Sequence, residues 1–262
     1  MGEDTGDPQA NEGGGRYFIT ALARGLDVLG CFTPADRGLT NLEISQRCKL
    51  PKSTVTRITA TLTQLGYLRQ NDEMGGRFSL GVRTLSLGSA AIAGMDIRQI
   101  ARPMLQDLAD STLSAVSLAV RDRLSLIYVE VCRSRAALGL TIQVGSRVPL
   151  SRLAVARAYL AWAGEAERRQ ILEQAGAVDR AVQEEIRADI LRGEADVAKY
   201  GCTTSFGDWQ KDINGIAMAF VPPGQTVPMA INCGGAAFQL TPSFLLDEVR
   251  PRLIAIVNDL RG

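Results

Sequence analysis

The stretch LTNLEISQRCKLPKSTVTRITATLTQL, residues Leu39 to Leu65, decides how the rest of the chain is interpreted. Thr40 and Glu43 have the spacing of a capping box, in which a hydroxyl and a carboxylate bind free amide groups at a helix start. Pro51 lacks an amide hydrogen and pushes the residue before it out of helical geometry. The pattern predicts a helix from Asn41, with apolar contacts from Leu42, Ile44 and Cys48, and then a turn over Lys49 to Pro51.

A second helix is predicted from Ser53. Val55, Ile58, Leu62 and Leu65 recur at helical spacing and form one narrow stripe, which is expected to pack inward. The opposite face carries short hydroxyls, a small residue and cations: Ser53, Thr56, Arg57, Ala60 and Gln64, with Lys52 near the helix start. Slim side chains fit a major groove, while hydroxyls, helix-start amides and arginine bind phosphates or guanine. The predicted DNA contacts are Lys52, Ser53, Thr54, Thr56 and Arg57; the alternative is an ordinary solvated face.

A β-hairpin is predicted directly after this helix pair. Gly66–Arg69 and Arg77–Leu80 are strand-like runs around a turn, residues 72–76, that ends in two glycines. A helix pair followed by a hairpin forms a winged helix-turn-helix. Arg77 and Arg69 are candidates to touch the DNA backbone from the wing, with solvated strand residues as the alternative.

Charge is unevenly distributed along the 262 residues. Residues 16–85 carry ten lysines and arginines against five acids, whereas residues 86–262 carry nineteen of each. The formal net charge of +1 for the whole chain hides this difference. A cationic small domain on a neutral larger one suits a DNA-binding head with a second domain of another task.

Several function classes are excluded by composition. The chain has no histidine, which rules out Ser-His-Asp and Cys-His catalysis and histidine-based metal sites. Its five cysteines form no CxxC pair, so neither a zinc cluster nor a disulfide framework is indicated, and no metal or cofactor is expected. No apolar run reaches the length of a membrane span, and residues 1–15 lack the apolar core of a signal peptide. We expect a cytoplasmic protein with a disordered tail over residues 1–15.

The remaining chain reads as mixed helices and antiparallel strands, an α+β fold. An early helix, Thr20 to Phe32, is expected to brace the helix pair through Ile19, Leu22, Leu26, Leu29 and Phe32. A small-residue helix, Arg83 to Ala93, is expected to link the domains, with a dimer contact and intrachain packing as equal alternatives. From Asp96 onward the predicted helices are 97–108, 151–163, 165–174, 180–200 and 241–260, the strands are 116–120, 125–131, 137–144, 202–206, 216–221 and 227–233, and 145–149 is a turn.

The segments GLDVLGCF, LTNLEISQRCKLPKSTVTRITATLTQLGYL, GGRFSLGVRTLSLG, VGSRVPLSRLAVARAYLA and INGIAMAF resemble the IclR family of bacterial transcriptional regulators. The resemblance covers nearly all of residues 16–262. It implies a winged helix-turn-helix over 16–82, a linker helix over 83–95 used in dimerisation, and a GAF-like effector-binding domain over 96–262. Such a domain binds a small organic metabolite, often a carboxylate.

The resemblance also implies an effector pocket. Carried onto this sequence, the pocket positions are Leu140, Val148, Ala154, Val155, Ser205, Ile213, Gly215, Asn232 and Gly234. The chain departs from the family pattern at Ser151, where many members have histidine, and at Ala156-Arg157, which replaces the familiar Gly-Lys. Asn232, Gly234 and Gly215 stand at positions that are often serine or cysteine.

Trp209 is a pocket candidate on chemical grounds alone. It lies in a polar, glycine-bearing loop, Gly207–Asp212, between two predicted strands, where it can cover a ligand or simply anchor the loop on the core. Helix-start amides at Ala154 and Val155 suit a carboxylate. Asp208 and Asp212 are the close carboxylate pair that an enzyme would use, but paired surface acids are normally solvated.

The sequence therefore predicts a non-enzymatic regulator. Its expected partners are double-stranded operator DNA, a small organic-acid effector, for which an aromatic acid is an option, and further copies of itself as a homodimer or dimer of dimers, without a membrane. The alternative is a small-molecule-binding or interaction module without specific DNA binding.

Overall fold

A computed structural model describes residues 17–71, 75–137 and 142–261. The expected tail over residues 1–15 and the pocket candidate Leu140 lie outside these residues. The chain forms two compact units, residues 1–93 and 94–262, each with its own apolar core.

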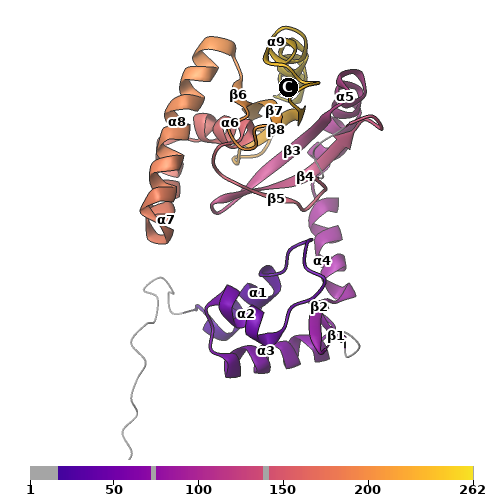
Figure 1. Cartoon of the computed structure of the whole chain (residues 1–262), viewed down its shortest axis with the longest axis vertical. Helices are drawn as coiled ribbons and strands as arrows, with labels where there is room; N and C mark the ends of the chain where they lie inside the picture. The colour runs from indigo at the N-terminus through magenta and orange to yellow at the C-terminus, as the bar shows by residue number, and fades with distance from the viewer. Residues whose placement is uncertain (1–16, 72–74, 138–141, 262) are drawn as a thin grey trace, which may run out of the picture. The chain divides into compact units, whose positions relative to one another are not determined.

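The first unit is built on three helices, α1 (Thr20–Gly30), α2 (Asn41–Cys48) and α3 (Lys52–Gln64) (Figure 1). The predicted capping box is confirmed: the amide of Glu43 donates to Thr40 Oγ1 at 3.2 Å, and the amide of Thr40 donates to Glu43 Oε2 at 2.7 Å. Lys49 ends α2 in the left-handed region, with φ 54°. Val28, Leu39, Ile44, Val55, Leu68 and Phe78 make the core.

The predicted hairpin is also present. Strands β1 (Leu68–Asn71) and β2 (Arg77–Leu80) pair antiparallel, and Gly75 and Gly76 both adopt φ 71°, which a side chain disfavours. Leu39 exchanges backbone hydrogen bonds with Phe78, so the hairpin is joined to the chain just before α2. Helix α4 (Val82–Ala93) completes the unit.

The predicted packing faces of three helices need correction. On α1, Leu22 and Leu26 are 59% and 58% exposed and Val28 is the buried residue, so the stripe expected to brace the helix pair lies mainly on the surface of the chain. On α3, Thr59 occupies the buried seam and Leu65 is 48% exposed. Thr59 tolerates burial because its hydroxyl donates to Asn41 Oδ1 at 3.0 Å. On α2, Leu42 is likewise exposed rather than packed.

The second unit contains one six-stranded antiparallel sheet in the order β5-β4-β3-β8-β7-β6. The strands are β3 (Ala115–Asp122), β4 (Ser125–Arg133), β5 (Arg147–Pro149), β6 (Thr203–Phe206), β7 (Ile213–Phe220) and β8 (Met229–Ala236). The helices are α5 (Asp96–Thr112), α6 (Ala154–Trp162), α7 (Glu165–Val178), α8 (Arg180–Tyr200), α9 (Pro242–Phe244) and α10 (Arg250–Arg261).

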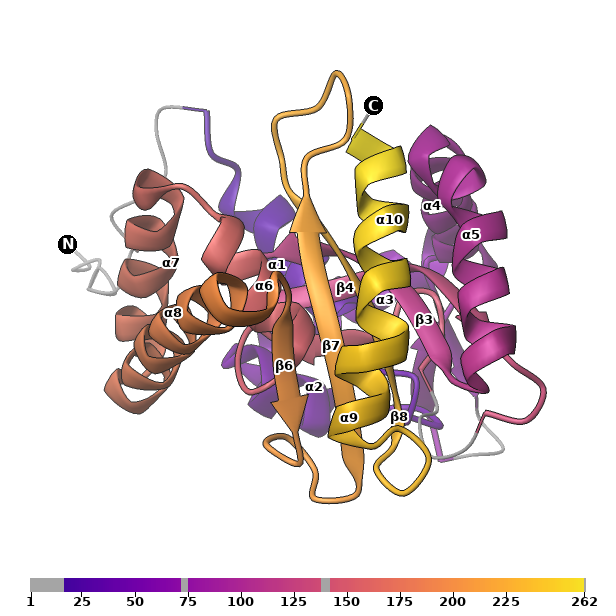
Figure 2. The ribbon, with the colours of Figure 1, turned by 90° about the horizontal axis from the view of Figure 1, so that it is seen from above.

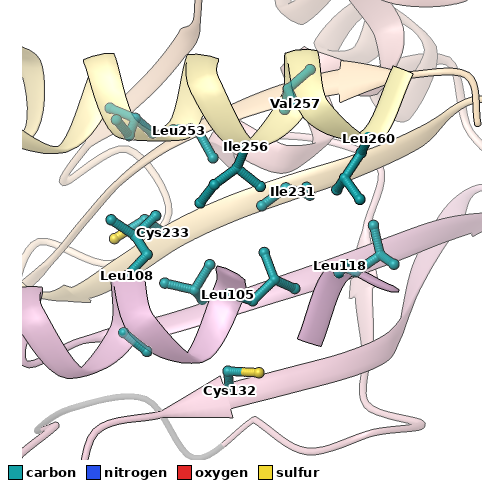
Figure 3. Packing of buried hydrophobic residues seen from close by; sticks show 14 of the residues in the cluster. Leu105, Leu108, Leu118, Cys132, Ile231, Cys233, Leu253, Ile256, Val257 and Leu260 are labelled. Carbon is teal, nitrogen blue, oxygen red and sulfur yellow. The ribbon is translucent and has the colours of Figure 1, made fainter. Parts of the chain in front are cut away.

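Large side chains cover one face of this sheet. Leu105 and Leu108 of α5 and Leu253 and Val257 of α10 pack with strand residues such as Ile231 (Figure 3). Figure 2 shows α10 lying along β7, with α5 beside it. Residues of this cluster are almost fully excluded from water, and their burial is the main source of stability for this face.

Small side chains occupy the opposite face. Ala119, Ala217, Ala219 and Ala230 project toward α6, which is buried along most of its length. Because alanine leaves the helix room to approach, α6 contacts β6, β7 and β8 together. Helices α7 and α8 pack outside α6.

Several element boundaries differ from those predicted. Residues 142–144 form no strand, and the rest of the run expected over 137–144 lies mostly outside the described residues. Residues 147–149, expected as a turn, form the edge strand β5, which pairs with β4. The last helix contains a π-helical segment, Leu245–Val249, in which Arg250 donates to the carbonyl five residues earlier. Pro251 lies two residues after this segment and has no amide hydrogen to give to a regular helix.

Candidate functional site

The outward face of α3 is the candidate nucleic-acid interface. Lys52, Ser53, Thr56 and Arg57 are exposed and Thr54 is half-buried, as expected for a helix that enters a groove. Pro51 precedes the helix without a side-chain cap, so the first amides of α3 remain available to a phosphate.

Asn41 is a residue that sequence reasoning missed. Its amide accepts from Thr59 and donates to Thr56 Oγ1 at 3.4 Å, so the first residue of α2 sets the position of the α3 face. The Thr56 hydroxyl in turn donates to Lys52 O at 3.0 Å. The sequence does not indicate this role, because Asn41 and Thr56 are fifteen residues apart and meet only in the folded domain.

Arg77 is tied to other parts of its own domain by hydrogen bonds, although its side chain stays partly exposed. Its guanidinium donates to Gly38 O at 2.7 Å and to Glu43 Oε2 at 2.9 Å, which joins the wing to α2. Hydrogen bonds from Thr40 and the charge of Arg77 lower the pKa of Glu43. Arg69, the other wing cation, is exposed.

The second unit contains a cavity between the start of α6 and the sheet. It brings together all nine described residues predicted for the effector pocket: Val148, Ala154, Val155, Ser205, Trp209, Ile213, Gly215, Asn232 and Gly234. Tyr128, Ile142, Leu153 and Asn214 also line it and were not predicted. The cavity volume is about 40 Å³, enough for a few water molecules, so a larger ligand requires the lining to open.

Strand register explains why the sheet side of the cavity is open. Ser205, Gly215 and Gly234 are consecutive partners across β6, β7 and β8, so two of the three positions carry no side chain. Asn232 lies two residues before Gly234 on β8 and therefore on the same face. Two glycines and one asparagine leave a hollow under α6.

The start of α6 provides donors. Leu153 is its N-cap residue and offers no side-chain cap, so the amides of Ala154 and Val155 have no acceptor within the helix. The helix was predicted to begin at Ser151, but it begins at Ala154. The reason is that Arg152 adopts φ 63° and its amide donates to Asp189 Oδ2 at 2.5 Å. Aligned peptide dipoles add a partial positive charge at this end.

The loop that carries Trp209 is fixed by a buried cation. Arg157 on α6 is 3% exposed and binds Asp189 Oδ1 and Asp208 Oδ2, each at 2.6 Å, and Thr204 O at 2.7 Å. Burial alone would lower the pKa of Arg157, but the bonds to Asp208 and Asp189 outweigh it and raise the pKa. Arg192 also binds Asp208, at 2.9 Å. Asp208 is thus committed to two arginines and forms no acid-base pair with the exposed Asp212.

Two polar side chains meet inside the cavity. Asn232 is 8% exposed and its Oδ1 has no hydrogen-bond partner among the described residues. Burial raises the pKa of the Tyr128 phenol, and a hydrogen bond from Asn232 partly offsets this. Ser205 donates its hydroxyl proton to Arg152 O at 2.9 Å.

Comparison with known families identifies both units. The IclR helix-turn-helix domain matches residues 21–72, and the bacterial transcriptional regulator IclR C-terminal domain matches residues 89–261. The chain belongs to the IclR family of bacterial transcriptional regulators. Members of this IclR family are DNA-binding and non-enzymatic, in agreement with the sequence analysis.

Individual relatives in the IclR family match over nearly full length. The HTH-type transcriptional regulator TsaQ1/TsaQ2 of Comamonas testosteroni is 32% identical over 97% of this chain and 92% of its own. The Pca regulon regulatory protein of Pseudomonas putida is 27% identical over 98% of this chain and 85% of its own. The crystal structure of an IclR family regulator from Brucella abortus has a TM-score of 0.85 at 41% sequence identity. The match covers 96% of this chain and 95% of that chain.

Neither a membrane-spanning helix nor a metal-binding cluster occurs in the described residues. None of their helices is long and apolar enough to cross a membrane. The described cysteine, aspartate and glutamate side chains form no group of three or more that could hold a metal ion.

Proposed function

We propose that this IclR-family regulator reads an operator with α3 and that a small organic acid in the cavity controls its affinity for that operator. The observation that carries the first part is the exposed row of Lys52, Ser53, Thr56 and Arg57 on α3, with free helix-start amides beside it. Thr54 borders the row. Arg57 is the side chain able to read a guanine edge.

The wing contact is proposed for Arg69 in place of Arg77. Arg77 supports the wing through Glu43, and releasing it to a phosphate would leave that carboxylate without its cation. Arg69 is exposed on β1 and free to approach the sugar-phosphate backbone.

The uncapped start of α6 supports an acidic effector. No charged side chain lines the cavity among the described residues, so a single carboxylate bound by the amides of Ala154 and Val155 is the anion that the site suits. Trp209 and the apolar lining suit an aromatic body. An IclR homologue from Microbacterium hydrocarbonoxydans, with a TM-score of 0.69 at 23% identity over 92% of this chain and 99% of its own, was crystallised with 4-hydroxybenzoate, and this favours an aromatic acid here.

Assembly as a homodimer or dimer of dimers in the cytoplasm is part of the proposal. Two heads are needed for two half-sites. Leu22 and Leu26 of α1 and Leu87 of α4 are exposed and line one hollow of the first unit, and this apolar surface suits a contact between copies.

The test is operator binding measured against salt and ligand. We expect affinity for DNA selected from a random pool to fall steeply with salt, and a bound benzoate to change that affinity. Thermal shift identifies which acids bind. A protein that binds acids but shows no sequence preference in the selection would instead be the small-molecule-binding module.

A further inference from the structure

At the cavity, the start of α6 offers hydrogen-bond donors, whereas Asn232 and Ser205 of the sheet offer acceptor oxygens. Backbone amides at Ala154 and Val155 are donors without an acceptor in the helix. The side chains from the sheet offer the reverse: Asn232 Oδ1 is an acceptor without a donor, and Ser205 has already given its proton to Arg152 O. A ligand therefore meets donors from α6 and acceptors from β6 and β8.

Asn232 is the strongest of these signals. A buried carbonyl oxygen without a partner is uncommon, because its desolvation is then not compensated by a hydrogen bond. The amide cannot turn outward to water, because the residue is more than nine-tenths buried. Tyr128 and Asn232 both line the cavity, and Asn232 Oδ1 has no hydrogen-bond partner among the described residues, which makes it the atom that a ligand can satisfy.

We propose that the cavity selects monocarboxylic acids that also carry a hydroxyl, and that this hydroxyl donates a hydrogen bond to Asn232 Oδ1. The inference rests on the proposed acid-binding site and adds the second group that the effector must have. No cation lines the cavity among the described residues to compensate a second carboxylate, so dicarboxylic acids are rejected. An acid without the hydroxyl leaves Oδ1 unsatisfied and binds less tightly.

The experiment compares three kinds of aromatic acid by isothermal titration calorimetry on the full chain. Benzoate lacks the donor, 3- and 4-hydroxybenzoate have it at two positions, and the matching methoxybenzoates keep the oxygen but cannot donate. We expect one hydroxybenzoate to bind about tenfold more tightly than benzoate and its own methoxy analogue, the size of one satisfied buried hydrogen bond.

Variants then assign the preference to Asn232. Asn232→Leu should bind the hydroxybenzoate and benzoate with equal affinity. Ser117→Ala is the matched control, because Ser117 pairs with Asn232 in the sheet, is fully buried and also has no hydrogen-bond partner in the described part of the chain, yet does not line the cavity. It should keep the tenfold preference. Thermal melting checks that both variants fold, and the ligand comparison in the parent protein stands without them.

The outcomes separate the two proposals. If benzoate, hydroxybenzoates and methoxybenzoates bind with equal affinity and alter DNA binding, the acid effector holds and the hydroxyl requirement is wrong. A methoxy analogue that binds most tightly also overturns it, because the Asn232 amide would then present Nδ2 to the ligand. If no acid binds and operator affinity is unchanged by any of them, the proposed effector class fails, and the inference fails with it.

Discussion

Tyr128 and Glu130 lie two residues apart on β4 but face opposite sides of the sheet. Val129 between them is an extra residue, because Leu118 pairs with Glu130 while the next residue of β3, Ala119, pairs with Tyr128. This bulge reverses the alternation of side chains. Tyr128 thereby lines the cavity, and Glu130 binds α5 on the other face.

The first prediction follows from the Glu130 contacts. Glu130 is almost fully buried and accepts from Arg98 at 2.9 Å and Arg102 at 2.6 Å. Glu130→Ala should lower the free energy of unfolding by about 3 kcal/mol, because it removes the carboxylate that compensates two cations. Urea unfolding measures this. Glu165→Ala removes an exposed acid from an i,i+4 pair and should change stability by less than about 0.5 kcal/mol; equal effects would contradict the role of Glu130.

Local signals were readable from the sequence. The capping box at Thr40 and the long helix α8 were predicted correctly because their caps lie within a few residues: Asp179 accepts from Ala181, and Gly201 ends α8 with φ 73°. The pocket residues other than Trp209 came from the family resemblance, since they are spread over four strands and a helix, whereas Trp209 was a candidate because of its polar loop.

Long-range relationships were not readable. The Arg77–Glu43 pair joins residues 34 apart, and nothing near either residue indicates it. The position of Tyr128 depends on a bulge, which a strict two-residue alternation cannot reveal. The exposed stripe on α1 was misassigned because periodicity shows that a face is apolar, not what covers it.

The second prediction concerns the loop that carries Trp209. Asp208→Asn should free this loop, because Asp208 bonds to Arg157 and Arg192. In a Trp162→Phe background, acrylamide should then quench Trp209 fluorescence more strongly. Asp212→Asn, an exposed change in the same loop, should leave quenching unchanged. Equal quenching in both variants would show that Asp208 does not hold the loop.

The third prediction is a pH dependence. The pKa of Glu43 is lowered in the folded protein by the Thr40 hydrogen bonds and then by Arg77, so the stability it contributes is present above its ordinary value of 4.5 and is lost as pH falls through the lowered value. Glu43→Gln should therefore melt below the parent at pH 7, and the difference should shrink as pH falls below 4.5. A difference in melting temperature that stays constant down to pH 3 would contradict this.

The fourth prediction concerns assembly. Leu26→Glu places a charge in the exposed apolar surface of α1 and should weaken self-association in sedimentation at micromolar concentration. Leu191→Glu is the matched control, because Leu191 on α8 is comparably exposed. A parent protein that sediments as a monomer would refute the proposed dimer.

The last prediction assigns the readout of DNA to Arg57. Arg57→Ala should weaken binding to the selected operator by about 1–3 kcal/mol and relax base preference at one position in each half-site, because a bidentate arginine distinguishes guanine. Folding should be unaffected, since the side chain is exposed. Arg24→Ala removes the same charge from an exposed position on α1 and should lower affinity only through net charge, without a change of base preference. Fluorescence anisotropy at several salt concentrations separates these effects: a phosphate contact reduces the salt slope by about one and weakens all sequences alike, whereas a base contact weakens the selected sequence alone. If Arg57→Ala binds selected and random DNA with the affinities of the parent protein, α3 is not the recognition helix.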